Sequence, residues 1–132
     1  MKKILRFIFV LLAFALFLSS CTPLQSPKNK PPVAKITVYP AIKPVWQVFS
    51  IITFKGSDSY DPDGTIISYR WDFGDGSKIE EGEEVKHTFT TPGIYMVTLT
   101  VTDDRGSTGT DTREIGVVPP GGPPVSSAGV MV

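Results

Sequence analysis

The chain has 132 residues, which allows about one domain. Its 13 basic residues balance its 13 acidic ones, but three of the basic residues precede the first apolar run. The remainder is therefore mildly acidic and lacks the clustered basic face of a nucleic-acid-binding protein. One cysteine and one histidine exclude an internal disulfide and a multi-histidine metal site.

Residues 1–20 have the plan of an export signal. Lys2, Lys3 and Arg6 give a positively charged start, and residues 7–18 form an unbroken apolar run that is followed by small residues. A helix of that length spans about 18 Å, which is short of the roughly 30 Å core of a bilayer. We therefore predict a signal peptide over residues 1–20 rather than the alternative, a transmembrane anchor.

The sequence Leu18-Ser19-Ser20-Cys21 resembles the box that precedes the lipid-modified cysteine of bacterial lipoproteins. The resemblance implies cleavage before Cys21, a thioether-linked diacylglycerol on its sulfur and acylation of the new N-terminus. Three acyl chains anchor a protein far more firmly than one, which gives only marginal membrane binding. The predicted location is therefore the cell envelope, anchored by lipid and facing outside the cytoplasm. The resemblance, with Thr22 after the cysteine, favours the outer membrane if the organism has one.

Proline-rich segments flank a central domain. Residues 21–32 contain the lipidated cysteine and four prolines, and we predict an extended linker there. Residues 33–118 form the domain, and residues 119–132 form a Pro/Gly-rich tail. The tail is either a short docking segment or a linker to a lost downstream domain, and the sequence leaves both readings open.

The domain consists of short predicted strands separated by turns. Apolar and polar residues alternate in several runs, and turn residues lie between the runs. Six or seven such strands predict an all-β fold, an immunoglobulin-like β-sandwich of about seven strands. In one of them, the alternation places Ile67, Tyr69, Trp71 and Phe73 on the inward face. The predicted strands cover residues 33–38, 47–55, 65–73, 84–89, 93–102 and 108–118.

Residues 69–76, YRWDFGDG, resemble the signature motif of the PKD domain, a sandwich module named after the polycystic kidney disease protein. Residues 87–89, HTF, and residues 92–99, PGIYMVTL, agree with the family in order and spacing. The resemblance covers essentially all of residues 33–118. It implies a bacterial lipoprotein that carries a single PKD domain.

The motif residues are expected to be structural. The tryptophan is large enough to fill the space between two sheets. The two glycines permit the positive backbone angles of a tight turn, and the two aspartates can accept hydrogen bonds from its amides. The tyrosine follows a Pro-Gly turn, where it can form a tyrosine corner. These residues are Trp71, Asp72, Gly74, Asp75, Gly76 and Tyr95.

Acidic residues in two loops form a candidate calcium site. Asp61 and Asp63 lie between the second and third predicted strands and Asp103 lies between the last two, so the topology brings both loops to one end of the sandwich. Calcium takes about six to eight oxygen ligands, which carboxylates and carbonyls can supply. The PKD resemblance implies the same ion at these three aspartates, because related domains of secreted collagenases carry calcium in this region. Asn29 or its neighbours in the linker could add a ligand. The alternative is that each aspartate only caps its turn.

No other group of residues in the sequence predicts a metal site or a catalytic site. An EF-hand at residues 59–64 is rejected, because position twelve of that loop would be Arg70 where a bidentate glutamate is required. His87 shares a strand face with apolar residues, and we expect it to be partly buried and hydrogen-bonded to a turn. The acidic run at residues 80–84 is expected to be a solvated rim. We therefore predict that the chain is not an enzyme.

The predicted function is a non-enzymatic, lipid-anchored surface module that contacts an envelope protein or acts as a spacer. The alternative is a carbohydrate-binding accessory domain of the kind associated with secreted hydrolases, with a polysaccharide as partner. A fragment of a larger hydrolase is a third reading. Trp46 is the predicted binding residue, because it lies outside the inward positions of the strands, as do Phe49, Tyr39 and Tyr60, and exposed aromatic residues mark a protein- or sugar-binding face. A register shifted by one residue would instead bury half of these four residues.

Overall fold

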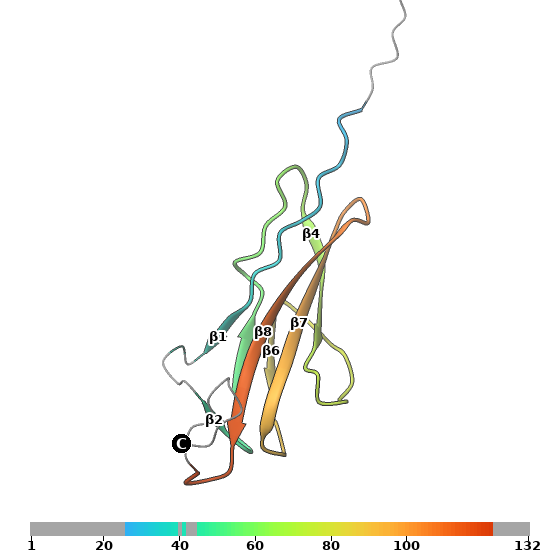
Figure 1. The fold of residues 1–132 in the computed structure, drawn as a ribbon. Coiled ribbons are helices and arrows are strands. Elements are labelled where there is room, and N and C mark those ends of the chain that lie inside the picture. Colours follow the sequence, from blue (N-terminus) through green and yellow to red (C-terminus); the bar gives the residue numbers. More distant parts are fainter. Residues whose placement is uncertain (1–25, 40, 42–44, 123–132) are drawn as a thin grey trace, which may run out of the picture.

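The computed structural model describes residues 26–39, 41 and 45–122 (Figure 1). Its eight strands are β1 (Thr37–Tyr39), β2 (Trp46–Gln47), β3 (Ile52–Lys55), β4 (Ile66–Asp72), β5 (Glu80–Glu81), β6 (Glu84–His87), β7 (Gly93–Asp103) and β8 (Thr108–Val118). They form a three-stranded sheet in the order β1-β3-β6 and a five-stranded sheet in the order β2-β8-β7-β4-β5. The predicted all-β sandwich is confirmed, with eight strands where the sequence predicts about seven.

Several of the predicted features lie outside the residues that the structure describes. The signal peptide and Cys21 lie outside them, and so do residues 123–132 of the predicted tail. Among the described residues there is no helix with the length and hydropathy that a bilayer span requires.

Strand boundaries differ from the predictions mainly in the first half of the domain. The predicted strand at residues 33–38 is largely irregular, and Val33 forms only an isolated bridge with Tyr60. The predicted strand at residues 47–55 is divided into β2 and β3 by a turn at Phe49, whose φ angle is 64°. Strand β5 is only two residues long, too short for alternation to reveal it in the sequence.

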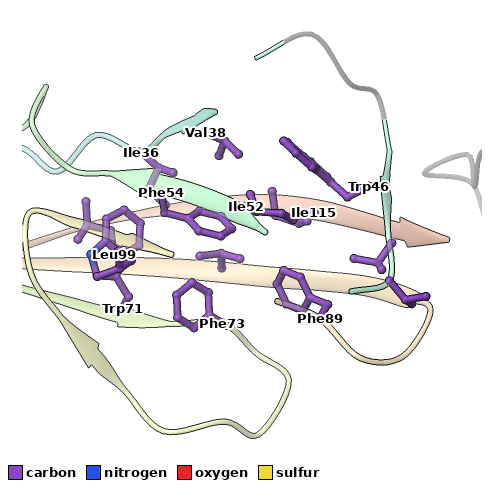
Figure 2. Packing of buried hydrophobic residues seen from close by; sticks show 14 of the residues in the cluster. Ile36, Val38, Trp46, Ile52, Phe54, Trp71, Phe73, Phe89, Leu99 and Ile115 are labelled. Atoms are coloured by element: carbon purple, nitrogen blue, oxygen red, sulfur yellow. The ribbon is translucent and has the colours of Figure 1, made fainter. Parts of the chain in front are cut away.

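The core lies between the two sheets (Figure 2). Strand β7 shows the alternation most clearly, because Val97, Leu99 and Val101 are buried while the residues between them face outward. From the opposite sheet Phe54 packs against Trp71, with ring centroids 5.9 Å apart. Burying side chains of this kind contributes about 1.5–3 kcal/mol each, so the core supplies the main driving force for folding.

One predicted strand face is wrong at its start. The alternation in β4 places Ile67 inward with Tyr69 and Trp71, whereas Ile67 is 65% exposed and Ile66 packs against the core. The register between β4 and β7 shifts between Ile66 and Ser68, which marks a β-bulge. An extra residue in one strand inverts the alternation, and the sequence pattern alone does not reveal it.

The segment before β1 is held against β8. The carbonyl oxygen of Pro32 approaches Gly109 so closely that a side chain at position 109 would overlap with it. The Ile36 amide donates a hydrogen bond of 2.8 Å to the Asp111 carboxylate. These contacts fix the direction in which the chain enters the domain.

Candidate functional site

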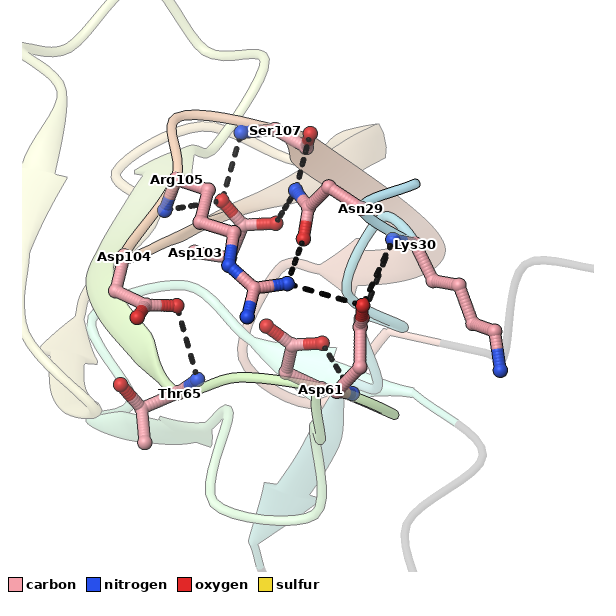
Figure 3. A network of polar contacts seen from close by, with 9 residues as sticks. Asn29, Lys30, Asp61, Thr65, Asp103, Asp104, Arg105 and Ser107 are labelled. Atoms are coloured by element: carbon pink, nitrogen blue, oxygen red, sulfur yellow. Dashed lines mark hydrogen bonds and ion pairs between the residues drawn. The ribbon is translucent and has the colours of Figure 1, made fainter. Parts of the chain in front are cut away.

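Two loops and the N-terminal segment meet at one end of the sandwich (Figure 3). The loop before β4 supplies Asp61 and Asp63, and the turn between β7 and β8 supplies Arg105. Asp103 ends β7, and Asn29 comes from the segment before β1. The three aspartates of the candidate calcium site thus come from segments that meet at this end.

Asp103 is the buried carboxylate of the cluster. Its Oδ1 atom accepts hydrogen bonds from the amides of Arg105 at 2.9 Å and Ser107 at 2.8 Å, and its Oδ2 atom accepts one from the Asn29 side chain at 2.8 Å. Burial by itself raises the pKa of Asp103, but these hydrogen bonds lower it by more, so the pKa lies below its ordinary value. Asp103 therefore stays ionised and joins the turn to the N-terminal segment.

Arg105 supplies the positive charge at this end. Its Nη1 atom donates to Asn29 Oδ1 and to Asp63 Oδ2, each at 3.0 Å. The Lys30 amide also donates to Asp63, at 3.1 Å from Oδ1. Asp63 and Arg105 thus bind the last part of the predicted linker to the domain. The sequence offers no signal for this role of Arg105, because its partners are 42 and 76 residues away.

Asp61 is incompletely paired. Its Oδ1 atom accepts the Asp63 amide at 3.1 Å, which caps the loop, but its Oδ2 atom is buried and has no hydrogen-bond partner among the described residues. That oxygen lies 2.7 Å from where a side-chain carbon would stand at Gly64, and a carboxylate oxygen of Asp104 approaches the same position. Two carboxylates therefore converge on a glycine that leaves room between them.

The chemistry of this end suits a hard cation, although its present arrangement is closed. Asp61, Asp63, Asp103 and Asp104 are opposed by one arginine, and a buried carboxylate oxygen without a partner calls for an explanation such as a bound ion. Within the described part of the chain, however, no three or more carboxylate, imidazole or thiol side chains are already arranged to hold a metal. Calcium would require Arg105 to release Asp63 and Asn29, so calcium remains a prediction.

The motif residues lie in and beside the turn that follows β4. The Trp71 indole is buried and donates a 2.9 Å hydrogen bond to the Gly82 carbonyl. Asp72 accepts the Gly74 amide at 2.9 Å, and Asp75 accepts the Ser77 amide at 3.0 Å. Gly74 and Gly76 have φ angles of 69° and 79°, in the region that favours glycine. Each of these contacts shapes the turn rather than a ligand site.

Tyr95 ties another turn to the sheet. Its hydroxyl donates to the Thr91 carbonyl at 2.8 Å and lies 2.7 Å from the Thr91 hydroxyl. Its ring stacks on Phe89, with centroids 4.3 Å apart. This is the geometry of a tyrosine corner.

His87 is buried between carboxylates, not beside a nucleophile. Its Nε2 atom is paired with Asp75, and its Nδ1 atom is 3.5 Å from Glu80 Oε1. The sequence predicts a partly buried histidine bound to a turn, but not its second partner. Glu80 belongs to the acidic run at residues 80–84, which the sequence describes only as a solvated rim.

Trp46 is not an exposed contact residue. It is 6% exposed and belongs to the core, because β2 pairs in parallel with the end of β8 and directs the indole between the sheets (Figure 2). The prediction that Trp46 binds a partner through an exposed ring is therefore wrong. The cause is not a shifted register, because Val48, Ile52 and Phe54 are buried as predicted, and Trp46 precedes Val48 by two residues on the same inward face.

The exposed aromatic residue of this region is Phe49. The Ser50 amide donates to the Gln47 carbonyl at 3.1 Å, which closes a tight turn around Phe49, and the Phe49 amide donates to the Phe89 carbonyl at 2.9 Å. The side chain is 68% exposed, and the neighbouring Ile51 is exposed as well. Phe49 is the one non-glycine residue of the described ranges with a positive φ angle, a conformation that its sequence does not signal.

Comparison with protein families gives a match to the PKD domain over residues 29–117. Among curated proteins, the pre-pro-metalloprotease PrtV of Vibrio cholerae is 34% identical over 110 residues, which is 79% of this chain and 12% of that protein. Collagenase ColA of Clostridium perfringens is 46% identical over 67 residues, which is 51% of this chain and 6% of that protein. The chain thus spans about an eighth or less of the length of these relatives.

Solved structures share the same fold. The PKD1 domain of Vibrio anguillarum Epp is 34% identical with a TM-score of 0.59, and the match covers 70% of this chain and all of that domain. A structure described with carbohydrate-binding modules of the β-sandwich superfamily is 34% identical with a TM-score of 0.66. That match covers 74% of this chain and 38% of the other.

Proposed function

Because the chain belongs to the PKD domain family, we propose that it is a non-catalytic module, anchored outside the cytoplasm through a lipid on Cys21, that contacts an envelope protein. The family match covers residues 29–117, whereas the proteolytic activities in the relatives' names belong to chains many times longer. Collagen is an extracellular substrate, so the relatives named as collagenases support a location outside the cytoplasm. Their activity is not carried over to this chain.

The observation that carries the proposed contact is the strained and exposed Phe49. A left-handed backbone costs a non-glycine residue about 1–2 kcal/mol, and burial of the ring does not offset this cost because the side chain is 68% exposed. Strain of this kind, held by the surrounding structure, is typical of contact sites. With Ile51, the ring places exposed apolar surface in the connection between β2 and β3.

The position of Phe49 suits a lipid-anchored module. The N-terminal segment joins the domain at the end formed by Asn29, Asp63 and Arg105, whereas β2 and the start of β7 lie at the other end (Figure 1). Strand β7 has 11 residues and connects the two ends. At about 3.4 Å per residue it holds them roughly 35 Å apart, so the fold carries Phe49 away from the anchored side.

A binding experiment with the full-length chain tests the proposed contact. The chain is purified in detergent, immobilised and exposed to envelope extract, alongside F49G and I67S variants. Ile67 is an exposed apolar residue of the same size class in a different region, so I67S is the matched control. A specific protein retained by the unmodified chain and by I67S but lost with F49G supports the proposal. Equal retention by all three excludes Phe49 as the contact.

We also propose that calcium binds at the end opposite Phe49. Asp61, Asp63 and Asp103 would hold the ion, with the Asn29 side-chain oxygen as a further ligand once Arg105 withdraws. The excess of carboxylates over arginine and the unpartnered Asp61 Oδ2 atom support this proposal. The ion would fix the angle between the linker and the domain without entering any reaction.

A further inference from the structure

The outer face of the five-stranded sheet carries polar side chains that neither the core nor the proposed contact at Phe49 uses. Since Val97, Leu99 and Val101 of β7 point into the core, the residues between them point away from it. Directly opposite residues of neighbouring antiparallel strands share a face of the sheet. The register therefore determines which side chains of β4 and β8 join the outward threonines of β7.

Two rows of side chains cross this face. Thr98 lies between Asp72 of β4 and Thr112 of β8, and the next row places Thr100 between Arg70 and Thr110. Adjacent strands are about 4.8 Å apart, so each row is a short series of closely spaced polar groups. Strand β7 is the central strand of the three (Figure 1).

A shallow depression of about 230 Å³ opens where these rows meet the connection between β4 and β5. It is lined by Arg70, Asp72, Ile79, Thr98 and Thr100. The lining combines a guanidinium group, a carboxylate, two hydroxyls and one exposed aliphatic side chain, and its two formal charges cancel. A lining of this kind fits a neutral ligand that both donates and accepts hydrogen bonds and has an apolar face.

The polar groups of the depression have hydrogen-bonding capacity to spare. Asp72 accepts the Gly74 amide with Oδ1, and within the described ranges its other oxygen has no partner. Arg70 Nε is 3.6 Å from Glu81 Oε1, and both side chains are largely exposed, so this ion pair holds the guanidinium only weakly. The hydroxyls of Thr98 and Thr100 make no hydrogen bond to any described residue.

We propose that this depression binds one sugar unit of a neutral polysaccharide. Vicinal hydroxyls of a sugar match the carboxylate and guanidinium groups, the threonine hydroxyls can bind further ring substituents, and Ile79 offers an apolar contact for the C–H face of the ring. The volume is below the roughly 300–1,000 Å³ of sites that enclose a whole drug-sized ligand, so the depression holds a unit of a longer chain rather than a free molecule. Thr110 and Thr112 continue the polar surface along which the neighbouring units would lie.

An extended peptide fits this surface less well. Peptides that bind β-sheets pair with the backbone of an edge strand, whereas the depression lies on a sheet face, where the backbone groups already pair between β4 and β7. The saccharide site is independent of the proposed protein contact at Phe49. A negative result for one proposed site does not contradict the other, because the two sites lie on different elements of the sandwich.

An NMR titration tests the saccharide site. The ¹⁵N-labelled full-length chain, in micelles of a detergent without a sugar headgroup, is titrated with cellohexaose, chitohexaose, xylohexaose and laminarihexaose to millimolar concentration. We expect at least one of them to shift the amide signals of Arg70, Thr98 and Thr100 in a saturable manner. A collagen-like Gly-Pro-Hyp peptide serves as the comparison ligand and is expected to leave these signals in place.

A pair of variants separates binding from folding. The double substitution T98V/T100V removes both hydroxyls but keeps the branched shape and the strand preference, and we expect at least tenfold weaker saccharide binding. T53V makes the same change on β3 of the other sheet and is expected to bind normally. The proposal is overturned if no saccharide shifts these signals, if the peptide alone does, or if T98V/T100V binds as well as the unmodified chain.

Discussion

His87 lies flat against Phe73, with ring centroids 3.8 Å apart and planes 6° from parallel, while its Nε2 atom is 2.7 Å from Asp75 Oδ2. Phe89 packs edge-on against the same imidazole at 4.8 Å. The histidine thereby joins the turn after β4 to β6, a strand of the other sheet. The acidic turn of the family motif is thus connected to the aromatic core through the pair of Asp75 and His87.

The pair makes stability depend on pH in the acid range. Burial by itself raises the pKa of Asp75, but hydrogen bonds from Ser77 and His87 lower it by more, so the folded-state pKa lies below the ordinary 3.8. A depressed carboxyl pKa gives stability that is present above the unfolded-state pKa and is lost as the pH falls through the folded-state value. We expect D75N to lower the free energy of unfolding by about 1–3 kcal/mol at pH 6, because a partly buried hydrogen bond between a charged carboxylate and His87 is lost.

Urea denaturation at a series of pH values from 6 downward measures this effect. The difference between the unmodified chain and D75N should narrow below the ordinary carboxyl pKa. The exposed Glu114 provides the control E114Q, which should leave the free energy of unfolding nearly unchanged at pH 6. A difference between the unmodified chain and D75N that stays constant down to the lowest pH contradicts the role given to the Asp75 carboxylate.

Replacing Phe49 by glycine should stabilise the domain. Glycine adopts a φ angle of 64° without steric cost, and little buried surface is lost because the ring is largely exposed. We expect F49G to raise the free energy of unfolding by about 1 kcal/mol. S50G, one residue further along at an ordinary backbone angle, should instead lower it slightly. Chemical denaturation of the unmodified chain, F49G and S50G measures whether the free energy of unfolding rises with F49G and falls with S50G. A destabilised F49G would show that the ring contributes to packing.

Calcium should raise the melting temperature of the domain. Ligands that bind only the folded state stabilise it by about 2.7 kcal/mol when present at about 100 times their dissociation constant. We expect millimolar calcium to raise the Tm by several degrees relative to chelator, and D61N to abolish the rise. D58N changes a carboxylate that accepts a hydrogen bond from the Thr37 hydroxyl and is not one of the proposed calcium ligands. This variant should therefore keep the rise in Tm with calcium. Equal Tm values with calcium and with chelator would show that the folded domain does not bind calcium.

Replacing Cys21 by serine should prevent lipidation of the protein. Serine has no thiol to carry the thioether-linked lipid that the sequence predicts, so C21S should fail to incorporate an alkyne-labelled fatty acid. It should also leave the membrane fraction or remain as an uncleaved precursor. S20A, which keeps a small residue before the cysteine, should be labelled normally. Labelling of C21S equal to that of the unmodified chain would contradict lipidation at this residue.

The fold was largely predictable from the sequence because its strongest signals are local. The alternation around Val97, Leu99 and Val101 specifies a strand and its buried face, and the Gly-Asp-Gly turn after β4 is specified by residues that favour such turns. The bulge at Ile67 was not predictable, because it depends on which residue of a distant strand lies opposite. Trp46 was placed wrongly because the predicted strand began at residue 47, although Trp46 precedes the inward Val48 by two residues and shares its face.

The candidate site was predictable only in part. The aspartates were identified from their types and from the loops that carry them, because topology brings those loops to one end. The role of Arg105 depends on contacts with Asn29 and Asp63, which no local pattern encodes. Phe49 was identified as an aromatic residue outside the inward positions, but its backbone strain was not, because a positive φ angle is inferred from glycine or asparagine and not from phenylalanine.

Site-specific photo-crosslinking in intact cells tests the central claim most directly. A photoreactive phenylalanine analogue replaces Phe49 in the full-length chain, and a second strain carries it at Ile67. The account predicts a discrete crosslinked protein from position 49, in the membrane fraction, and none from position 67. Crosslinks that are equally strong from both positions, or absent from position 49, would contradict a lipid-anchored module that contacts an envelope protein through Phe49.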